Sequence, residues 1–542
     1  MTSNVGSPLP DEAMIQVFLR MLLAAHANGD DVQALLKGFD ESIREVVWAE
    51  FQRQPFTVGP TPPTIDGDKD RELCQHDSSN GFFWRQLRDY LYRNSSRSPG
   101  EIDSLDEASD LVLQRIGEPS DTQSNLSAVK GLVVGYVQSG KTANYTALAA
   151  KAFDAGYKIV IVLAGVHNSL RRQTQLRLED ELGLIKSSAE RSTASLTGPT
   201  EEHLITAVTS ADLKSGDFRQ IAMSNDVLSE GRFLFVTKKN ASVLKALIKW
   251  LGKGRSQPTL IIDDEADQAT PNTRGNRIPP GIFEDDDYAV DSDQSPTEIN
   301  KQIRILLGLF ANRSYVGYTA TPFANVFIDQ NAHDVQAGED LFPEDFIVSL
   351  PKPRNYMGPT EFFGPSGSSG EAPPLSSRLI VQVDEADATS LDKLEATILR
   401  SEKPLEDWEF LPASLRNAVE DFVIATSIRR STLDSRVPSS MLVHTTPSQD
   451  KQRRIHEVLT SYWNKLRREY KYSTDEAETY WQRSLARFWS QSSTGEAAPD
   501  FAALKPQLEF LLKGGGSVEI LLLNHGSEDE LDYEINRTLT AI

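Results

Sequence analysis

The chain has 542 residues and a formal net charge of −22 at pH 7, with 39% hydrophobic and 25% charged residues, as in a soluble globular protein. This length allows roughly two to four domains, and no apolar run approaches the roughly 18 residues that cross a bilayer. The acidic balance argues against a surface that coats nucleic acid non-specifically, so any nucleic-acid contact must be local. Cys74 is the only cysteine, which excludes an internal disulfide framework and a cysteine-based zinc cluster. The N-terminus does not have a signal-peptide pattern, and we expect a cytoplasmic protein.

Residues 1–115 are predicted to form a helical N-terminal region. Apolar residues recur at three- and four-residue spacing within 11–56, and the segments 81–94 and 105–116 repeat that spacing. The favoured interpretation of this region is a scaffold or a docking site for a partner.

The pattern then changes to short apolar runs separated by segments of helical length. Such alternation is typical of a parallel sheet covered by helices on both faces, so residues 116–330 are predicted to form an α/β domain. Residues 331–405, rich in Pro, Gly and Ser, are expected to be a linker or insertion. Residues 406–542 are expected to form a second, partial α/β unit with a helical insertion. The runs that carry these expectations are strands at 131–137, 158–165, 232–238, 258–267 and 314–322, then a helix at 414–430, a strand at 440–446, helix through 450–490 and a strand at 518–524.

The stretch GYVQSGKT, residues 135–142, satisfies the pattern G-x-x-x-x-G-K-[ST] between a predicted strand and a predicted helix. Glycines let successive backbone N–H groups face phosphate oxygens, with the helix N-terminus behind them. Lys141 is predicted to reach the β- and γ-phosphates and Thr142 to bind Mg²⁺. The residues predicted to cradle ATP are Gly135, Gln138, Ser139, Gly140, Lys141 and Thr142.

A second motif, LIIDDEAD, ends an apolar run about 120 residues later. Two acids at the end of a buried strand suit an NTPase, with Asp264 holding Mg²⁺ and Glu265 positioning and polarising the attacking water. Asp263 is a rival for the metal role. The alternative reading is an acidic loop on a solvated face.

A third motif, GYTATPFAN, follows the last apolar run of this domain. The hydroxyls of Thr319 and Thr321 can hydrogen-bond the acidic strand end and report the state of the γ-phosphate to another domain. We therefore expect these two threonines to couple the nucleotide site to motion.

These motifs, in this order, resemble motifs I, II and III of superfamily 2 helicases and translocases. Residues 131–179, LIIDDEADQAT, GYTATPFANVFID and DLFPEDFIVSLPKP together resemble the Z1-domain proteins, bacterial helicase-like ATPases described as putative endonucleases and associated with restriction or phage-defence loci. The resemblance covers most of the chain from about residue 80 onward. It implies RecA-like P-loop NTPase lobes with ATP and Mg²⁺ as cofactors.

The resemblance also implies a nucleic-acid contact after the second predicted strand. Short polar and cationic side chains suit contacts to phosphate. The alternative is the exposed face of an ordinary helix. The five residues expected to contact nucleic acid are Asn168, Arg171, Arg172, Gln173 and Gln175, and Lys238, Lys239 and Asn240 form a weaker candidate set.

Two features of the family pattern are not found in the sequence. No late motif with an arginine finger follows residue 524, so we expect either that the chain is a fragment of a longer protein or that hydrolysis depends on another subunit. No nuclease signature is present: Asp500 with Lys505 lacks Glu-x-Lys, and the eight histidines do not form an H-x-x-x-H pair.

The sequence thus favours a helicase-like motor or remodelling ATPase acting on nucleic acid in a bacterial restriction or anti-phage system. DNA is the favoured nucleic acid. An ATP-gated scaffold that recruits a partner effector without translocation is an alternative. A nuclease with an accessory ATPase is a third reading.

Overall fold

A computed structural model divides the chain into two compact units, Met1–Tyr356 and Met357–Ile542. None of the described helices is both long enough and apolar enough to cross a membrane. The residues that the structure describes are scattered positions of 15–47, then 64–67, 72–78, 81–95, 97, 99–121, 128–137, 140–184, 204–211, 228, 231–252, 254–271, 296–328, 333–334, 338–352, 356–358, 362, 380–383, 385–389, 411–432, 438–446, 448–472, 474–492, 498–513, 518–522 and 540–541.

The first unit is built on an eight-stranded sheet with the order β1-β10-β2-β7-β6-β3-β5-β4. All neighbouring strands run parallel except β1 and β10, which pair antiparallel at one edge. The five central predicted strands are present, and their near-continuous apolar sequences follow from burial on both faces. The strands are β1 Thr64–Asp66, β2 Val129–Val134, β3 Ile159–Ala164, β4 Ile205–Ala207, β5 Arg232–Thr237, β6 Thr259–Asp264, β7 Arg313–Thr319 and β10 Phe346–Ser349.

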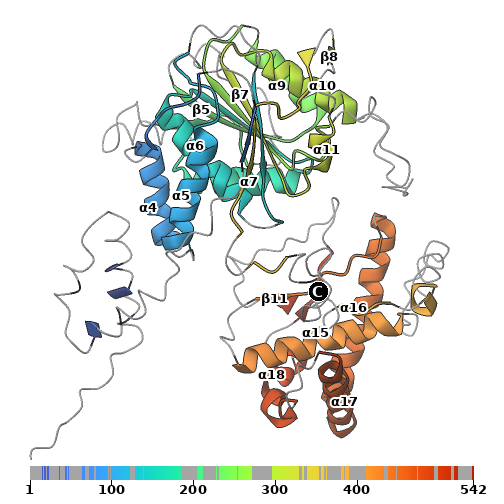
Figure 1. Ribbon diagram of the computed structural model, residues 1–542. Helices are drawn as coiled ribbons and strands as arrows, with labels where there is room; N and C mark the ends of the chain where they lie inside the picture. Colours follow the sequence, from blue (N-terminus) through green and yellow to red (C-terminus); the bar gives the residue numbers. More distant parts are fainter. Residues whose placement is uncertain are drawn as a thin grey trace, which may run out of the picture. The chain divides into compact units, whose positions relative to one another are not determined.

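Helices cover both faces of this sheet (Figure 1). Along β3, Val160 and Val162 point into one apolar cluster while Ile159 and Ile161 point into the other, because side chains alternate along a strand. The predicted α/β fold, a parallel RecA-like sheet flanked by helices, is confirmed. One cluster is closed by α4 Phe82–Asn94, α5 Pro99–Leu113, α6 Lys141–Ala155 and α7 Asn168–Glu181, and the other by α9 Ala241–Leu251 and α10 Pro296–Leu307.

The helices α4 and α5 are part of the first unit, since they pack directly on α6. Lys151 of α6 is fully buried and forms ion pairs with Asp106 at 2.5 Å and Asp110 at 2.8 Å, both on α5. Its ammonium also lies 4.5 Å from the ring centroid of Trp84 on α4. The carboxylate of Asp154 accepts hydrogen bonds from two backbone N–H groups at the start of α4. Earlier in the chain, the described residues of 15–47 are helical and include a small apolar cluster around Leu22.

The segment expected to be a linker contributes a strand to the sheet. β10 pairs in parallel with β2, the strand that leads into the phosphate loop, with Phe346 opposite Gly131. A two-stranded ladder, β8 His333–Asp334 with β9 Gly338–Glu339, precedes it. The expected linker boundary at 331 is therefore wrong for these residues. A four-residue strand between Pro-containing stretches gives too little periodicity to be predicted.

The second unit packs four helices and a small parallel sheet around its own core. The predicted helix at 414–430 is present, and the stretch at 450–490 forms two helices. Of the predicted strand at 440–446 only Ser440 is paired, and of the described residues 518–522 only Val518 and Glu519 are paired. The elements are α15 Ala413–Thr432, β11 Ser439–Ser440, α16 Gln449–Tyr472, α17 Thr474–Ser492, α18 Phe501–Lys513, β12 Val518–Glu519 and β13 Thr540–Ala541, in the sheet order β11-β13-β12.

A buried carboxylate joins three helices of this second unit. Glu420 of α15 accepts hydrogen bonds from Tyr462 at 2.6 Å, from Ser484 at 2.8 Å, from Arg487 at 3.0 Å, and from Tyr480. Burial by itself would raise the pKa of this carboxyl, but the four donors outweigh burial and hold the pKa below its ordinary value. The charged carboxylate is therefore the stable form in the folded unit.

Candidate nucleotide-binding site

The phosphate loop joins β2 to α6 as the sequence predicts. The N–H of Gly135 donates to the carbonyl of Thr319 at 3.0 Å, which ties the start of the loop to the end of β7. Gly140 has φ +95°, a left-handed conformation that favours glycine, and α6 begins at Lys141. Two residues of the predicted cradle, Gln138 and Ser139, lie outside the described residues.

Space at the loop requires a glycine at position 135. A Cβ added to Gly135 would lie 2.9 Å from Cγ of Lys141 and 3.2 Å from Cδ1 of Leu350. Lys141 is only 8% exposed, so its stem cannot move into open solvent to make room. Gly135 thus lets the backbone approach the lysine stem closely.

Asp263 and Asp264, the two candidates for the metal ligand, are the last residues of β6, and β7 lies between β6 and β2. The carboxylate of Asp263 is fully buried and already engaged. It forms an ion pair with Lys239 at 3.0 Å and accepts hydrogen bonds from Thr270 at 2.8 Å and Tyr315 at 2.7 Å. Asp263 therefore has a structural role in this arrangement, and Asp264 is the better placed of the two for a metal.

Asp264 is held by two donors. Its Oδ2 accepts from the hydroxyl of Tyr145 on α6 at 3.1 Å, and its Oδ1 accepts from the N–H of Glu265 at 3.0 Å. Burial raises the pKa of Asp264, while Tyr145, Lys239 and Lys141 act to lower it. Burial also raises the pKa of Glu265, which is opposed chiefly by the charge of Lys141. The charges of Lys141 and Lys239 thus both act to lower the pKa of Asp264 and of Glu265.

Glu265 stands on an unusual backbone. Its φ is +50°, in the left-handed region that residues with a Cβ adopt at a cost of about 1 kcal/mol or more. The turn continues with a hydrogen bond from the N–H of Gln268 to the carbonyl of Glu265 at 2.9 Å. The sharp turn redirects the chain immediately after the acidic strand.

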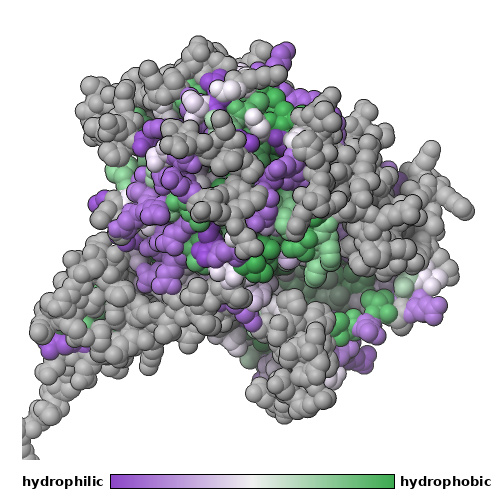
Figure 2. Space-filling model, turned by 45° about the horizontal axis from the view of Figure 1, so that its top comes forward, coloured by the Kyte–Doolittle hydropathy of each residue, from purple (hydrophilic) through white to green (hydrophobic). Residues whose placement is uncertain are grey.

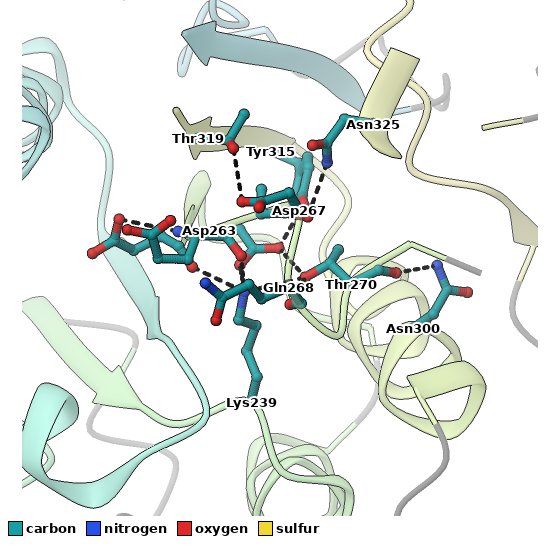
Figure 3. Close-up of polar contacts among 12 residues, drawn as sticks. Lys239, Asp263, Asp267, Gln268, Thr270, Asn300, Tyr315, Thr319 and Asn325 are labelled. Carbon is teal, nitrogen blue, oxygen red and sulfur yellow. Dashed lines mark hydrogen bonds and ion pairs between the residues drawn. The ribbon is translucent and has the colours of Figure 1, made fainter. Parts of the chain in front are cut away.

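The third motif contacts the acidic turn through Asp267 (Figure 3). One carboxylate oxygen accepts from the hydroxyl of Thr319 at 2.7 Å, and the other accepts from Thr321 at 2.6 Å. Asn325, in the short helix α11 Phe323–Val326, donates to the carbonyl of Ala266 at 2.9 Å. Both threonines expected to bind the acidic strand end therefore lie on it, and their partner is the last acid of the motif.

Sequence reasoning missed the role of Lys239, which it placed in a weak nucleic-acid set. The side chain is fully buried and reaches the acidic turn rather than the surface (Figure 3). Its Nζ donates to the carbonyls of Asp264 at 2.9 Å and Glu265 at 2.5 Å. Asn240 is also occupied, because its side chain accepts from two N–H groups at the start of α9. Lys238 and Lys239 lie just past the end of β5 at Thr237, so no strand alternation in the sequence separates the buried lysine from the outer one.

The five residues expected to contact nucleic acid divide between the surface and the interior of α7. Asn168 and Gln173 are exposed and Arg172 is partly exposed. Arg171 is 1% exposed and donates to the carbonyl of Ser210 at 2.8 Å. Gln175 is fully buried, bonded to Glu179 and Thr209. Arg171 and Gln175 are therefore directed into the interior, where they bond Ser210, Glu179 and Thr209.

The described surface in the view of Figure 2 mixes hydrophilic and hydrophobic residues. Two large apolar side chains that directly follow the Thr-Ala-Thr motif, Phe323 and Phe327, are each 71% exposed. Isolated exposed apolar residues are common on protein surfaces, so these two carry no assignment by themselves.

One family model matches part of the second unit. Residues 414–542 match the family model of the Z1 domain, which confirms the predicted resemblance over that segment. The match lies beyond the phosphate loop and the acidic turn. No curated protein sequence matches the chain significantly.

Two solved helicase structures are similar at low level. A Dbp5 variant of S. cerevisiae bound to RNA and ADP BeF3 has 13% identity and a TM-score of 0.26, covering 47% of this chain and 50% of that one. The chain thus spans half the length of that structure. The Hef helicase domain of Pyrococcus furiosus has 13% identity and a TM-score of 0.25, covering 72% of each chain.

Proposed function

We propose that this chain binds and hydrolyses ATP and couples hydrolysis to nucleic acid, as a helicase-like motor or remodelling ATPase. One observation carries the proposal: three motifs meet at the carboxyl edge of one parallel sheet. Ligands bind at this edge in open α/β sheets. The loop before Lys141 offers the phosphate cradle, Asp264 and Glu265 offer the acids, and Asp267 ties the acids to Thr319 and Thr321.

Each residue has a specific part in this proposal. Lys141 binds the β- and γ-phosphate oxygens, and the N-terminus of α6 adds its partial positive charge. The carboxylate of Glu265 orients the attacking water and accepts its proton at Oε. Burial raises the pKa of Glu265, which makes it a better proton acceptor near neutral pH than an exposed glutamate.

The donor set at the loop fits Mg²⁺. The cation prefers oxygen ligands and is commonly held by one or two protein groups together with phosphate oxygens. Thr142 and Asp264 would supply these oxygens, with Tyr145 fixing the orientation of the carboxylate. When bound, Mg²⁺ would neutralise negative charge on the phosphates.

The finer part of the proposal concerns partners and context. Asn168, Arg172 and Gln173 line the outer side of α7 and are the proposed contacts to the nucleic-acid backbone. DNA is the proposed ligand, and bacterial restriction or phage defence in the cytoplasm is the proposed setting. The Z1 match of residues 414–542 supports that setting through the family resemblance.

The test is the ATPase rate of the full chain with no nucleic acid, with single-stranded DNA, with double-stranded DNA and with RNA. The proposal expects hydrolysis that DNA accelerates. In Lys141→Ala, hydrolysis should fall by several orders of magnitude, because the phosphate charge loses its partner. Turnover retained in Lys141→Ala would disprove the phosphate-loop assignment, and a rate insensitive to DNA and RNA would disprove the motor.

A second function, an ATP-gated scaffold, is favoured by the net charge of −22. It expects partner binding that depends on ATP and not on nucleic acid. Pull-down with a non-hydrolysable ATP analogue, with and without DNA, separates the two functions.

A further inference from the structure

Lys239 contacts the acidic turn through two backbone carbonyls and two side chains. Its ammonium lies 3.0 Å from Oδ1 of Asp263 and donates to the carbonyls of Asp264 and Glu265 at 2.9 Å and 2.5 Å. It also reaches the hydroxyl of Thr270 at 3.4 Å, at the far end of the turn. One cation therefore spans the turn from its first residue to its last (Figure 3).

Burying the ammonium of Lys239 costs desolvation free energy that burying an apolar side chain at this position would not. A lysine is rarely fully buried, because taking an ammonium out of water is unfavourable unless it is paired and hydrogen-bonded. Here the carbonyl of Glu265 belongs to a residue whose φ of +50° is itself unfavourable. Donation by Lys239 to that carbonyl stabilises the strained conformation that aims the Glu265 side chain.

The backbone around Lys239 leads directly to the surface. Its own N–H donates to the carbonyl of Gly165 at the end of β3, at 2.7 Å. The preceding residue, Lys238, turns outward and donates to Oδ1 of Asn168 at 2.8 Å, at the first residue of α7. Adjacent residues of one strand end thus contact the proposed nucleic-acid face and the proposed catalytic turn.

We propose that Lys239 is a positioning residue that holds Glu265 in place and conveys to it a displacement of the β5 end when nucleic acid binds at Asn168 and Lys238. The nucleic-acid half of this inference rests on the proposed function. The positioning half rests only on the contacts of Lys239.

The test compares variants of the full chain. Lys239→Met alone leaves Asp263 as an unpaired buried charge and can prevent folding. The double variant Lys239→Met with Asp263→Asn removes both charges and keeps an acceptor for Thr270 and Tyr315. The matched control is Lys245→Met with Glu298→Gln, an ion pair of 2.7 Å between α9 and α10 whose side chains are 56% and 35% exposed.

Amide hydrogen exchange of peptides covering 264–270 measures, without any substrate, whether Lys239 holds the acidic turn in place. We expect exchange there to rise on the order of 10-fold in the Lys239 double variant and not in the control, because buried hydrogen bonds that hold the turn are lost. The ATPase kcat should fall on the order of 10- to 100-fold, with the affinity for a non-hydrolysable ATP analogue unchanged, because the base is misplaced while the cradle is intact.

The ratio of the DNA-stimulated to the basal ATPase rate tests whether nucleic-acid binding is transmitted through Lys239 to Glu265. It should fall to about 1 in the Lys239 double variant, as expected when the route from Asn168 and Lys238 is cut. A reduced kcat with an unchanged ratio would overturn transmission and keep positioning. Unchanged exchange and unchanged kcat would overturn both. If the wild-type rate does not respond to nucleic acid, the proposed function and the transmission step both fail, whereas exchange at 264–270 still decides the positioning role.

Discussion

The hydroxyl of Tyr145 donates a hydrogen bond to the carboxylate of Asp264 across 3.1 Å, joining the helix after the phosphate loop to the acidic strand. Tyr145 is fully buried, and burial raises its pKa far above the ordinary value, so the hydroxyl stays protonated and acts as the donor. The helix that carries Lys141 thereby also fixes the proposed metal ligand.

Tyr145→Phe should weaken Mg²⁺ binding. A single hydrogen bond to a charged group contributes about 1.5–3 kcal/mol, so the Mg²⁺ concentration at half-maximal ATPase rate should rise roughly 10-fold or more. Mg²⁺ titration at saturating ATP measures this. Tyr157→Phe is the matched control, because Tyr157 is equally buried but its hydroxyl binds Gly117 and Ser314. An equal Mg²⁺ requirement in both variants would refute the role of Tyr145.

Thr321→Val should separate hydrolysis from its response to nucleic acid. The variant removes the 2.6 Å hydrogen bond to Asp267 and leaves the phosphate loop intact. We expect nucleotide affinity to remain and the DNA-stimulated rate to drop several-fold more than the basal rate, because losing one hydrogen bond costs about 0.5–1.5 kcal/mol. Thr460→Val serves as control, since its hydroxyl donates to the carbonyl of His456 in its own helix and has no other hydrogen-bond partner among the described residues. Equal loss of basal and stimulated rates would contradict a coupling role.

Neighbouring arginines on α7 should behave differently. Arg172→Met should lower DNA affinity and reduce the salt dependence of binding by about one ion, as expected for a lost phosphate contact. Arg171→Met should instead lower the melting temperature, because Arg171 bonds the carbonyl of Ser210 in the interior. Fluorescence anisotropy over a range of salt concentrations and thermal unfolding together test the pair. Identical salt slopes for wild type and Arg172→Met would remove Arg172 from the proposed interface.

The second unit should lose stability in acid through Glu420. Its pKa is lower in the folded unit than in the unfolded chain, so its contribution is complete above the ordinary glutamate pKa of about 4.3 and disappears as pH falls through the lowered value. Urea unfolding followed by tryptophan fluorescence should show Glu420→Gln to be less stable than wild type at pH 7 by about 1–3 kcal/mol. That difference should shrink below about pH 4. A difference that stays constant down to about pH 3 would exclude this mechanism.

The strands that the sequence predicts well are those buried on both faces. β3 is a continuous apolar run, and β6 has an apolar centre followed by its two acids; in both, the buried apolar residues make the strand visible in the sequence. β1, with the sequence TID, and β10, with FIVS, lie at or near the sheet edge and are only three and four residues long. Their pairing depends on neighbours distant in the chain, which no local pattern encodes.

In the candidate site, too, the sequence predicts where the elements lie but not which side chains face the site. The spacing of the motifs locates the cradle and the acidic strand end, but it does not separate Asp263 from Asp264. Alternation along β6 sends the two carboxylates to opposite sides, and only the fold shows that Lys239, Thr270 and Tyr315 fill one side. Likewise, the sequence does not tell which polar residues of α7 face solvent. Only the fold shows that Arg171 and Gln175 bond partners in the interior.

The ion pairs of Lys151 determine where the first unit can be divided. A fragment that starts at β2, as motif positions alone would suggest, lacks Asp106 and Asp110 and leaves a buried ammonium without its acids. A fragment that stops before β10 exposes the flank of the strand leading into the phosphate loop. The smallest piece of this chain expected to fold and to bind nucleotide as proposed therefore starts before Pro99, where α5 begins, and runs past Ser349, where β10 ends.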